Sequence, residues 1–274
     1  MSFLRKTIFW YSRKVPASLR EVLGYLFLFY IKTVNFLKYK NKDLFHHVNI
    51  ELNRDCNRRC PYCPVSKYPE FKKDEKLTFE DYQKIIKELR KLNFSGEIHF
   101  TGYYEPLLEK DLIKYIKHAK GELKKVKIVV YTNGDYLGED ILKEFRKLSV
   151  FLIISMHGER ERNKKHKKIK EMTKSNNVII KKNIEEGLLS SRGGLVGVKK
   201  KDVKTRCILP SVELTIDSSG SVIICSDDFF SQYVFGNIKK ESILKTWNKE
   251  KFRRARKNIL LGKPSCKICK NCSN

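Results

Sequence analysis

From residue 46 onward, short apolar runs alternate with longer segments in which apolar residues recur every three or four positions. A helix is predicted over 79–92, because Thr78 can cap it and its apolar residues have helical spacing. Repeated strand–helix units build a parallel sheet, and about six of them make a partial (β/α)6, TIM-like barrel, so we predict an α/β fold with functional loops at the carboxyl ends of the strands. Buried strands are predicted at 48–52, 98–100, 126–131, 150–155 and 178–180.

Residues 1–45 have a different pattern and are predicted to form an N-terminal helical segment. Lys and Arg residues flank aromatic residues here, and an unbroken apolar run covers 22–31. A spanning helix needs about 20 apolar residues, whereas a basic, aromatic helix can lie in the headgroup plane of a membrane. We therefore expect peripheral association of residues 1–37 with an anionic membrane surface, with packing of this helix on the body of the protein as the alternative.

The charge and the cysteines narrow the class of protein. The sequence has 58 Lys+Arg against 31 Asp+Glu, which gives a formal charge of +27. Phosphorylated substrates, acidic lipid or nucleic acid would suit this charge, and a lysine-rich source organism would explain it without any partner. No cleavable signal with a small-residue site is evident, and the 8 cysteines are clustered, so we expect metal binding in a reducing cytoplasm instead of disulfides.

The strongest chemical signal follows the first predicted strand. Cys56, Cys60 and Cys63 form a C-x3-C-x2-C pattern. Three thiolates can bind three irons of a cubane and leave the fourth iron open for a small ligand, whereas an electron carrier normally closes its cluster with four cysteines. A zinc site is the alternative, but zinc knuckles favour paired C-x2-C motifs and four closed ligands.

This pattern, with an aromatic residue before the last cysteine, resembles the signature of the radical S-adenosylmethionine (SAM) superfamily. Two further segments follow in the family's order: 102–106 resembles its glycine-rich motif, which binds the SAM amino group, and 132–134 resembles its turn after the third strand. The resemblance implies a barrel core over 46–200, a SAM-binding [4Fe–4S] cluster, and a reducing electron donor of the flavodoxin or ferredoxin type. The cofactor-binding residues that it implies are Tyr62, Gly102, Glu105, Pro106, Asn133 and Ser155.

Residues 201–274 hold the other five cysteines. Together with a strand-like run at 212–216 they resemble the SPASM extension, or its shorter twitch form, which carries an auxiliary [4Fe–4S] cluster. The resemblance implies Cys207 and Cys225 as firm ligands, and leaves open which two of the last three cysteines complete the set. A structural zinc ribbon is the alternative, because zinc accepts the same thiolate geometry. The candidate ligands are Cys207, Cys225, Cys266, Cys269 and Cys272.

Three polar residues are candidates for catalysis. Arg192 lies where related enzymes often have an Arg-Gly pair near the active site, and a guanidinium there could bind a carboxylate. Asp227 and Asp228 follow Cys225, where relatives can place a general base. The alternatives are a polar loop for the arginine and an exposed turn for the aspartates.

The resemblance implies an enzyme in which a radical formed from SAM removes a hydrogen atom from its substrate, and in which an auxiliary cluster can accept an electron. We expect an oxidoreductase-like modification of a small polar substrate that is sugar-like or anionic. One alternative is a peptide-modifying maturase, which is disfavoured because residues 1–45 are short and apolar for a peptide-recognition domain. The other is a non-catalytic iron–sulfur protein that transfers electrons or binds nucleic acid, for which the charge is the main support.

Overall fold

The computed structural model describes residues 17–155, 178–181, 191–196 and 206–272. Its centre is one eight-stranded sheet in the order β5-β4-β3-β2-β1-β6-β7-β8. The strands from β5 to β6 in this order run parallel, and β7 and β8 continue the sheet in antiparallel fashion. This confirms the predicted α/β class. The strands are β1 (His47–Ile50), β2 (Glu97–Phe100), β3 (Lys127–Thr132), β4 (Phe151–Ser155), β5 (Val178–Lys181), β6 (Glu213–Ile216), β7 (Ser221–Ile223) and β8 (Val234–Asn237).

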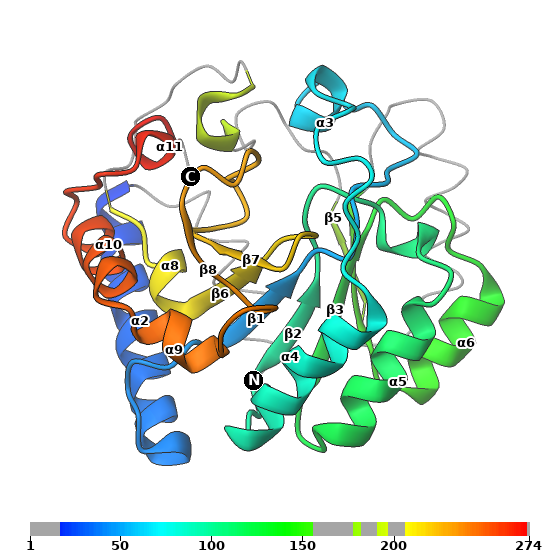
Figure 1. The fold of residues 1–274 in the computed structure, drawn as a ribbon, viewed down its shortest axis with the longest axis horizontal. Coiled ribbons are helices and arrows are strands. Elements are labelled where there is room, and N and C mark those ends of the chain that lie inside the picture. The colour runs from blue at the N-terminus through cyan, green and yellow to red at the C-terminus, as the bar shows by residue number, and fades with distance from the viewer. Residues whose placement is uncertain (1–16, 156–177, 182–190, 197–205, 273–274) are drawn as a thin grey trace.

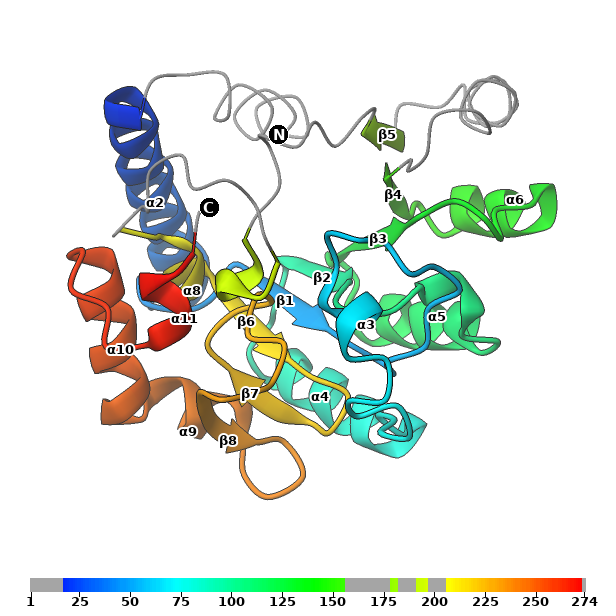
Figure 2. The same cartoon turned by 90° about the horizontal axis from the view of Figure 1, so that it is seen from above.

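Helices cover one face of the sheet and its β6 side. Figures 1 and 2 show α4, α5 and α6 along one face, and α2, α8, α10 and α11 grouped beyond β6. No helix in the described ranges is both long enough and apolar enough to cross a membrane. The helices are α2 (Ala17–Tyr39), α3 (Pro64–Lys67), α4 (Phe79–Lys91), α5 (Leu112–Glu122), α6 (Glu139–Lys147), α8 (Leu209–Val212), α9 (Ile243–Asn248), α10 (Glu250–Leu260) and α11 (Lys267–Lys270), with 3-10 turns η1 (Pro106–Leu108) and η3 (Arg192–Gly194).

The predicted elements of the barrel are confirmed. All five apolar runs form strands, β1 to β5, and they lie side by side in chain order. The Thr78 hydroxyl accepts a hydrogen bond from the Asp81 N–H at 3.2 Å and so caps α4. Tyr82, Ile85 and Ile86 of this helix are fully buried against the sheet.

The other face of the central strands is polar. His47 Nε2 of β1 lies 3.1 Å from Glu213 Oε2 of β6, and His47 stacks on His99 of β2 with ring centroids 4.8 Å apart. Asn49 Nδ2 donates to Thr215 Oγ1 at 3.3 Å one layer further along. These side chains are buried and alternate along the strands with apolar ones, so the sheet has one apolar and one polar face. The polar face ends at the edge of the sheet where the functional loops begin.

The tail extends the barrel sheet instead of forming a separate one. The predicted strand at 212–216 is β6, and it pairs with β1 on the side away from β2, with Val48 opposite Leu214. The cores also join, because Trp247 of α9 packs on Phe45 with ring centroids 5.2 Å apart. The boundary predicted near residue 200 falls in 197–205, outside the described residues.

Candidate functional site

The first cysteine group lies on the loop that leaves the carboxyl end of β1. Cys63 is extended, and its N–H donates to the Cys60 carbonyl at 2.9 Å. Pro64 then begins α3, because its fixed φ suits the first helical position. The loop holds three free, half-buried thiols, of which Cys56 is the first. Burial raises the pKa of Cys56, and nearby Glu105 and the two other cysteines raise it further.

Four polar residues fix this loop between its first two cysteines; we call them the Asp135 clamp. Arg58 Nη2 donates to Asp135 Oδ1 at 2.6 Å and its Nε to Oδ2 at 2.5 Å, which makes a two-pronged ion pair. Asn57 Nδ2 donates to Asp135 Oδ2 at 2.8 Å, and Asn133 Nδ2 donates to Asn57 Oδ1 at 2.9 Å. The turn after β3 therefore holds the cysteine loop, and the predicted site residue Asn133 is part of this contact.

Glu105 joins the ends of β2 and β3 to the same loop. Its carboxylate accepts hydrogen bonds from Thr132 Oγ1 at 2.6 Å, from the Asn133 N–H at 2.8 Å and from the Leu107 N–H at 3.1 Å. Its own N–H donates to the Asp55 carbonyl at 2.8 Å. Burial raises the pKa of Glu105 above its usual value, although these hydrogen bonds oppose the rise. Glu105 thus fastens three loops together.

The glycine-rich segment has a backbone that suits glycine. Gly102 has a φ of +145°, and a Cβ there would lie 3.0 Å from the Glu51 side chain at the end of β1. The following N–H, from Tyr103, donates to Glu51 Oε1 at 3.0 Å. Pro106 then begins η1. Glu51 therefore ties this segment to the strand from which the cysteine loop departs.

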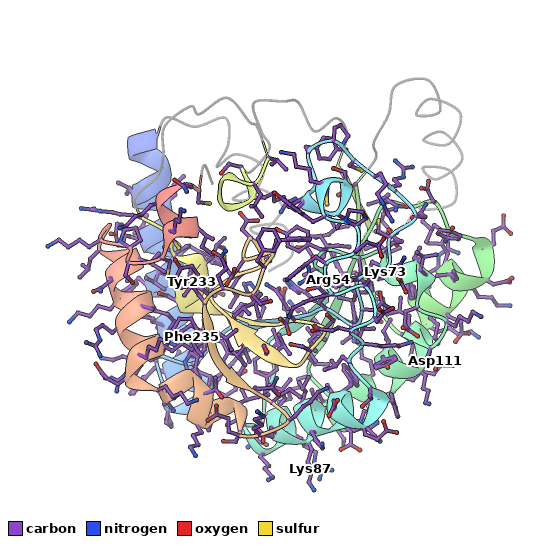
Figure 3. All side chains as sticks on the ribbon, turned by 45° about the horizontal axis from the view of Figure 1, so that its top comes forward. Arg54, Lys73, Lys87, Asp111, Tyr233 and Phe235 are labelled. Carbon is purple, nitrogen blue, oxygen red and sulfur yellow. The ribbon has the colours of Figure 1, made fainter. Side chains whose placement is uncertain are left out.

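Arg54 lies inside the fold among aromatic rings (Figure 3). Its guanidinium carbon is 5.0 Å from the Phe229 ring centroid, 5.5 Å from that of Tyr103 and 5.7 Å from that of Phe71. Its Nε forms an ion pair with Glu51 Oε1 at 2.9 Å. Burial raises the pKa of Glu51 from 4.5 to about 7, although Arg54 opposes the rise. Arg54 Nη1 is buried and has no hydrogen-bond partner among the described residues.

The Tyr103 side chain packs in one apolar cluster with Phe229, and Cys63 packs against the same cluster. The side chain is buried, and its oxygen finds no hydrogen-bond partner in the described part of the chain. Burial raises the pKa of this hydroxyl well above its usual value, and Asp227, Cys225 and Cys63 are near enough to raise it further. Leaving a buried hydroxyl without a partner costs free energy, so this position suits a polar ligand that supplies one.

The turn η3 brings Arg192 to the same place. Gly194 has a φ of +91°, and a Cβ there would lie 2.9 Å from the Asn271 side chain, so the turn packs directly on the tail. Ser191 Oγ donates to the Asn271 carbonyl at 2.7 Å. Arg192 Nη1 donates to Asp227 Oδ1 at 3.0 Å. Two of the three predicted catalytic residues are therefore in direct contact.

The surroundings of Asp228 differ from those of Asp227, the neighbouring predicted catalytic residue. Its two carboxylate oxygens accept hydrogen bonds from the N–H groups of Gln232 and Tyr233, at 2.9 Å each. Burial raises the pKa of Asp228, and these two N–H groups oppose the rise. The carboxylate closes the turn before β8, whereas its neighbour Asp227 contacts Arg192.

The five tail cysteines come from distant parts of the sequence and meet in one place. Cys207 precedes α8 and Cys225 follows β7, while Cys266 caps α11, Cys269 lies within it and Cys272 follows it. Cys266 and Cys269 share a side-chain hydrogen bond, and Cys269 is also near Cys225 and Cys207. Burial raises the pKa of Cys207 to about 12, with nearby Cys272 adding to the rise. Iron would therefore have to replace a proton that this thiol otherwise keeps.

The donor chemistry of both groups fits iron–sulfur clusters. All eight cysteines are free thiols. Within the described ranges, no three His, Cys, Asp or Glu side chains surround a single ion position. Three thiols on the loop leave one corner of a cubane for a small ligand, and five in the tail exceed by one the four that close a cluster.

The remaining predicted site residues lie near the same edge of the sheet. Tyr62 is half-buried beside Cys60; burial raises the pKa of its hydroxyl, and Cys60 raises it further. Ser155 is the last residue of β4 and is half-buried. Both positions are at or beyond the carboxyl ends of parallel strands, where ligand-binding loops belong.

The sequence analysis did not identify several residues of this site. Glu51, Arg54, Arg58 and Asp135 were missed, although each lies at or just beyond the carboxyl end of a predicted strand. Charged residues at that position are a signal for a site, because the ends of neighbouring parallel strands meet at one edge. Their pairing across the sequence has no local signature.

Comparison with known families gives two matches. The model of the radical SAM superfamily matches residues 50–197, and that of SPASM, an iron–sulfur cluster-binding domain, matches residues 207–273. Among curated proteins, the chain is 30% identical over 241 residues to the S-adenosyl-L-methionine-dependent 2-deoxy-scyllo-inosamine dehydrogenase of Niallia circulans. That alignment covers 84% of this chain and 94% of the relative.

Solved structures give the same result. BtrN in complex with AdoMet (SAM) and 2-DOIA is similar with a TM-score of 0.74 at 29% identity, over 84% of this chain and 94% of that one. Native anSMEcpe with bound AdoMet has a TM-score of 0.54 at 13% identity, over 76% and 82% of the two chains. The second similarity concerns the fold alone, while the first extends to the sequence.

Proposed function

Because this chain belongs to the radical SAM superfamily and carries a SPASM iron–sulfur domain, we propose that it oxidises an alcohol group of a sugar-like substrate. It is an enzyme that binds SAM, a [4Fe–4S] cluster and an auxiliary cluster. When bound, these groups supply a radical that removes a hydrogen atom and an acceptor for one electron. The residues of the chain bind, orient and deprotonate the substrate.

The observation that carries the proposal is the buried Tyr103 hydroxyl, whose hydrogen bonding no described residue satisfies, on a ring whose centroid lies 5.9 Å from the guanidinium carbon of Arg192. A hydroxylated substrate would satisfy it, because an alcohol both donates and accepts. Arg54 Nη1 is a second buried donor without a described partner, and the guanidinium carbon of Arg54 lies 5.5 Å from the centroid of the Tyr103 ring. The relative from Niallia circulans is named a dehydrogenase of 2-deoxy-scyllo-inosamine, which supports a sugar-like substrate here.

We assign the handling of the alcohol to Arg192 and Asp227. Oxidation of a CH–OH group to a ketone removes a hydrogen atom from carbon, a proton from oxygen and one further electron. Arg192 orients the hydroxyl as a donor, and Asp227, held at 3.0 Å by Arg192, accepts the proton. Asp228 is assigned to the turn, since both of its oxygens already accept backbone hydrogen bonds.

We assign the cofactors to the two thiol groups and the edge of the sheet. Cys56, Cys60 and Cys63 would hold the cluster that binds SAM, and Cys207 and Cys225, with two of the last three cysteines, would hold the auxiliary cluster. SAM would lie along the carboxyl ends of β1 to β4. Glu105 and Pro106 shape that border, because the Glu105 carboxylate already accepts three hydrogen bonds. The residues that would border SAM are Tyr62, Gly102, Asn133 and Ser155.

We also assign an acidic flavodoxin or ferredoxin as the electron donor, since the charge of +27 favours an anionic partner. The contact of residues 1–37 with a membrane is a separate proposal, because the oxidation itself does not require it.

Anaerobic reconstitution with iron, sulfide, SAM and a strong reductant tests the proposed reaction. The substrates are cyclic polyols and their amino derivatives, each deuterated on the carbinol carbon. We expect deuterium in 5′-deoxyadenosine together with a ketone product. If SAM is cleaved but no member of the panel transfers deuterium to 5′-deoxyadenosine, the proposal of alcohol oxidation is contradicted. Membership of the radical SAM superfamily would not be affected by that result. Tyr103→Phe should raise KM about tenfold while substrate-independent SAM cleavage is retained.

A further inference from the structure

Helix α2 has two apolar faces, and the residues that the structure describes cover only one of them. Leu28 and Ile31 are 5% and 2% exposed and pack with Val212 at the start of the tail. The Tyr25 hydroxyl donates to the carbonyl of Leu260 in α10 at 3.2 Å, which fixes the helix on the body of the protein. The other face, with Tyr25 at the border between the two, exposes a row of large apolar side chains, which we call the α2 stripe: Val22, Tyr25, Leu26, Phe29, Tyr30, Phe36 and Leu37.

The α2 stripe lies along one side of the helix. Its members over 22–30 recur at three- and four-residue spacing, and the pair at 36–37 lies two turns further along the same side, so the stripe is about 22 Å long. Phe29, Leu37 and Leu26 are 73%, 66% and 60% exposed. Of the 11 large apolar side chains exposed in the described residues, 7 belong to this stripe. Scattered exposure needs no explanation, but a patch of this kind marks an interaction surface.

Basic residues border the stripe. Helix α10 lies beside α2 in Figures 1 and 2, and the Tyr25 contact joins them. Leu261, at the end of α10, is itself 51% exposed. The exposed cations on and just beyond α10 are Lys251, Arg253, Arg254, Lys257 and Lys263. The surface thus combines an apolar row with a cationic flank.

We propose that the α2 stripe and the cationic flank of α10 dock on an anionic lipid bilayer, with α2 lying in the headgroup plane. Interfacial helices bind in this way, because apolar side chains enter the acyl boundary while Lys and Arg attract anionic headgroups. Tyr30 suits that depth, since its ring is apolar and its hydroxyl is polar. This inference is independent of the proposed reaction.

A second copy of the chain is a poorer occupant of this face. Each molecule carries a formal charge of +27, and two such faces would bring their cationic flanks together. An anionic bilayer reverses the sign of this interaction, so the same cations that oppose self-association favour the lipid.

The test is co-sedimentation of the full-length, cluster-loaded protein with vesicles of phosphatidylcholine alone or mixed with phosphatidylglycerol. We expect binding to the mixed vesicles at about 0.1 M salt, and weaker binding at about 0.5 M because the charges are then screened. Binding to neutral vesicles should be at least about tenfold weaker. Equal binding to both vesicle types, or no binding to either, would overturn the proposal.

Two sets of variants separate the apolar and the charged parts. Leu26→Gln, Phe29→Gln and Leu37→Gln combined should weaken binding at least about tenfold, whereas Val234→Gln, on an exposed residue of edge strand β8, should not. Arg253→Glu, Arg254→Glu and Lys257→Glu combined should weaken it similarly and flatten its salt dependence. The matched control is Lys87→Glu, Lys91→Glu and Lys124→Glu, which changes three exposed lysines that belong to neither the stripe nor the cationic flank; Lys87 is labelled in Figure 3.

Substrate-independent SAM cleavage and the visible spectrum of the clusters should be unchanged in every variant, because no proposed cluster ligand belongs to these sets. If the glutamine variant binds vesicles like the wild type, the stripe is not the docking face. If instead it converts a wild-type dimer into a monomer, measured by light scattering, a second copy covers the stripe and the lipid proposal is wrong.

Discussion

The two cysteine groups are assembled in opposite ways. Cys56, Cys60 and Cys63 lie on one loop, half-buried, and the Asp135 clamp holds that loop through side-chain hydrogen bonds. Cys207 and Cys272 stand near the two ends of the tail and come near each other only in the folded chain. The loop group can therefore form from local sequence with a few supports, whereas the tail group depends on the completed fold.

Because the two cysteine groups are assembled differently, different substitutions should weaken metal binding at each of them. A loop site fails when one of its few supporting contacts is removed, and metal affinity typically responds to such a change. A site assembled from distant segments fails when packing between them is disturbed, even if every ligand is intact. The following changes test this contrast, from the largest expected effect to the smallest.

Removing ligands should separate the two groups completely. Cys56→Ala, Cys60→Ala or Cys63→Ala should each abolish SAM cleavage, because two remaining thiols cannot present an open iron. Cys225→Ala should lower bound iron from about eight to about four per chain while SAM cleavage without substrate persists. Iron analysis and chromatography of 5′-deoxyadenosine measure both outcomes. SAM cleavage that survives all three loop changes would contradict the assignment of these cysteines to the cluster that binds SAM.

Loosening the loop should weaken only the first group. Asp135→Ala removes the ion pair with Arg58 and the hydrogen bond from Asn57. We expect a loss of about 10-fold to 100-fold in affinity for the first cluster, measured as release to a chelator. Glu122→Ala, which breaks the exposed ion pair with Arg90 at 2.8 Å, is the control and should have no effect. Equal release from both variants would mean that the clamp does not support the cluster.

Disturbing the contact between η3 and the tail should weaken the second group. Gly194→Ala places a Cβ at a φ of +91° and 2.9 Å from the Asn271 side chain, next to Cys272. We expect a loss of about 1–3 kcal/mol in unfolding free energy, with faster loss of the auxiliary cluster. Gly121→Ala in α5 meets nothing within 4 Å and should be neutral or slightly stabilising. The comparison fails if the two substitutions shift the urea midpoint equally.

The smallest effect concerns pH at the end of β1. The pKa of Glu51 is raised from 4.5 to about 7 by burial, so above pH 4.5 the folded state binds more protons at this carboxyl than the unfolded state. Its contribution therefore destabilises the fold increasingly as the pH rises toward 7. Glu51→Gln removes the titrating carboxyl. The unfolding free energy of this variant, relative to that of the wild type, should therefore increase by about 1 kcal/mol between about pH 6 and about pH 8.

Urea unfolding of both proteins at the two pH values measures this difference. Glu75→Gln, at a partly exposed carboxylate that pairs with Lys72 at 3.2 Å, serves as the control. A constant stability gap between the Glu51 variant and the wild type would show that the carboxyl titrates alike in both states.

Local pattern predicted most of the barrel but little of its assembly. The apolar runs gave β1 to β5 because each run is buried against helices such as α4, and Thr78 marked the start of that helix. The same pattern holds no information on which strand lies beside which. The pairing of β6 with β1, which makes the tail part of the barrel sheet, depends on packing between residues far apart in sequence.

The site divides in the same way. The spacing of the three loop cysteines is a local signal, and it identified that group directly. Arg58 and Asp135 form their ion pair across a separation of 77 positions, so no window of sequence contains both. Tyr103 lies within the segment 102–106, and its burial against Phe229 of the tail depends on the fold, so no local pattern identified it.

The N-terminal segment shows why two readings of one pattern were both reasonable. The apolar run over 22–31 supplies Leu28 and Ile31 to the core and Leu26 and Phe29 to the exposed stripe. An unbroken run of apolar residues places apolar side chains on every side of a helix, so one side can pack on the protein while the other stays exposed. Packing on the body therefore does not exclude contact with a membrane, which remains a prediction.

Strand β1 has one more consequence. The first cysteine loop departs from its end, and on its outer edge it pairs with β6, which leads through β7 to Cys225. One continuous ladder of main-chain hydrogen bonds therefore joins the strands from which the two loops depart. Separating these strands would break buried backbone pairing, so β6 and β7 cannot swing away from β1 like a hinged domain. The strand ends keep a fixed spacing, and any shift of the first cysteine loop relative to Cys225 has to come from the loops that carry them.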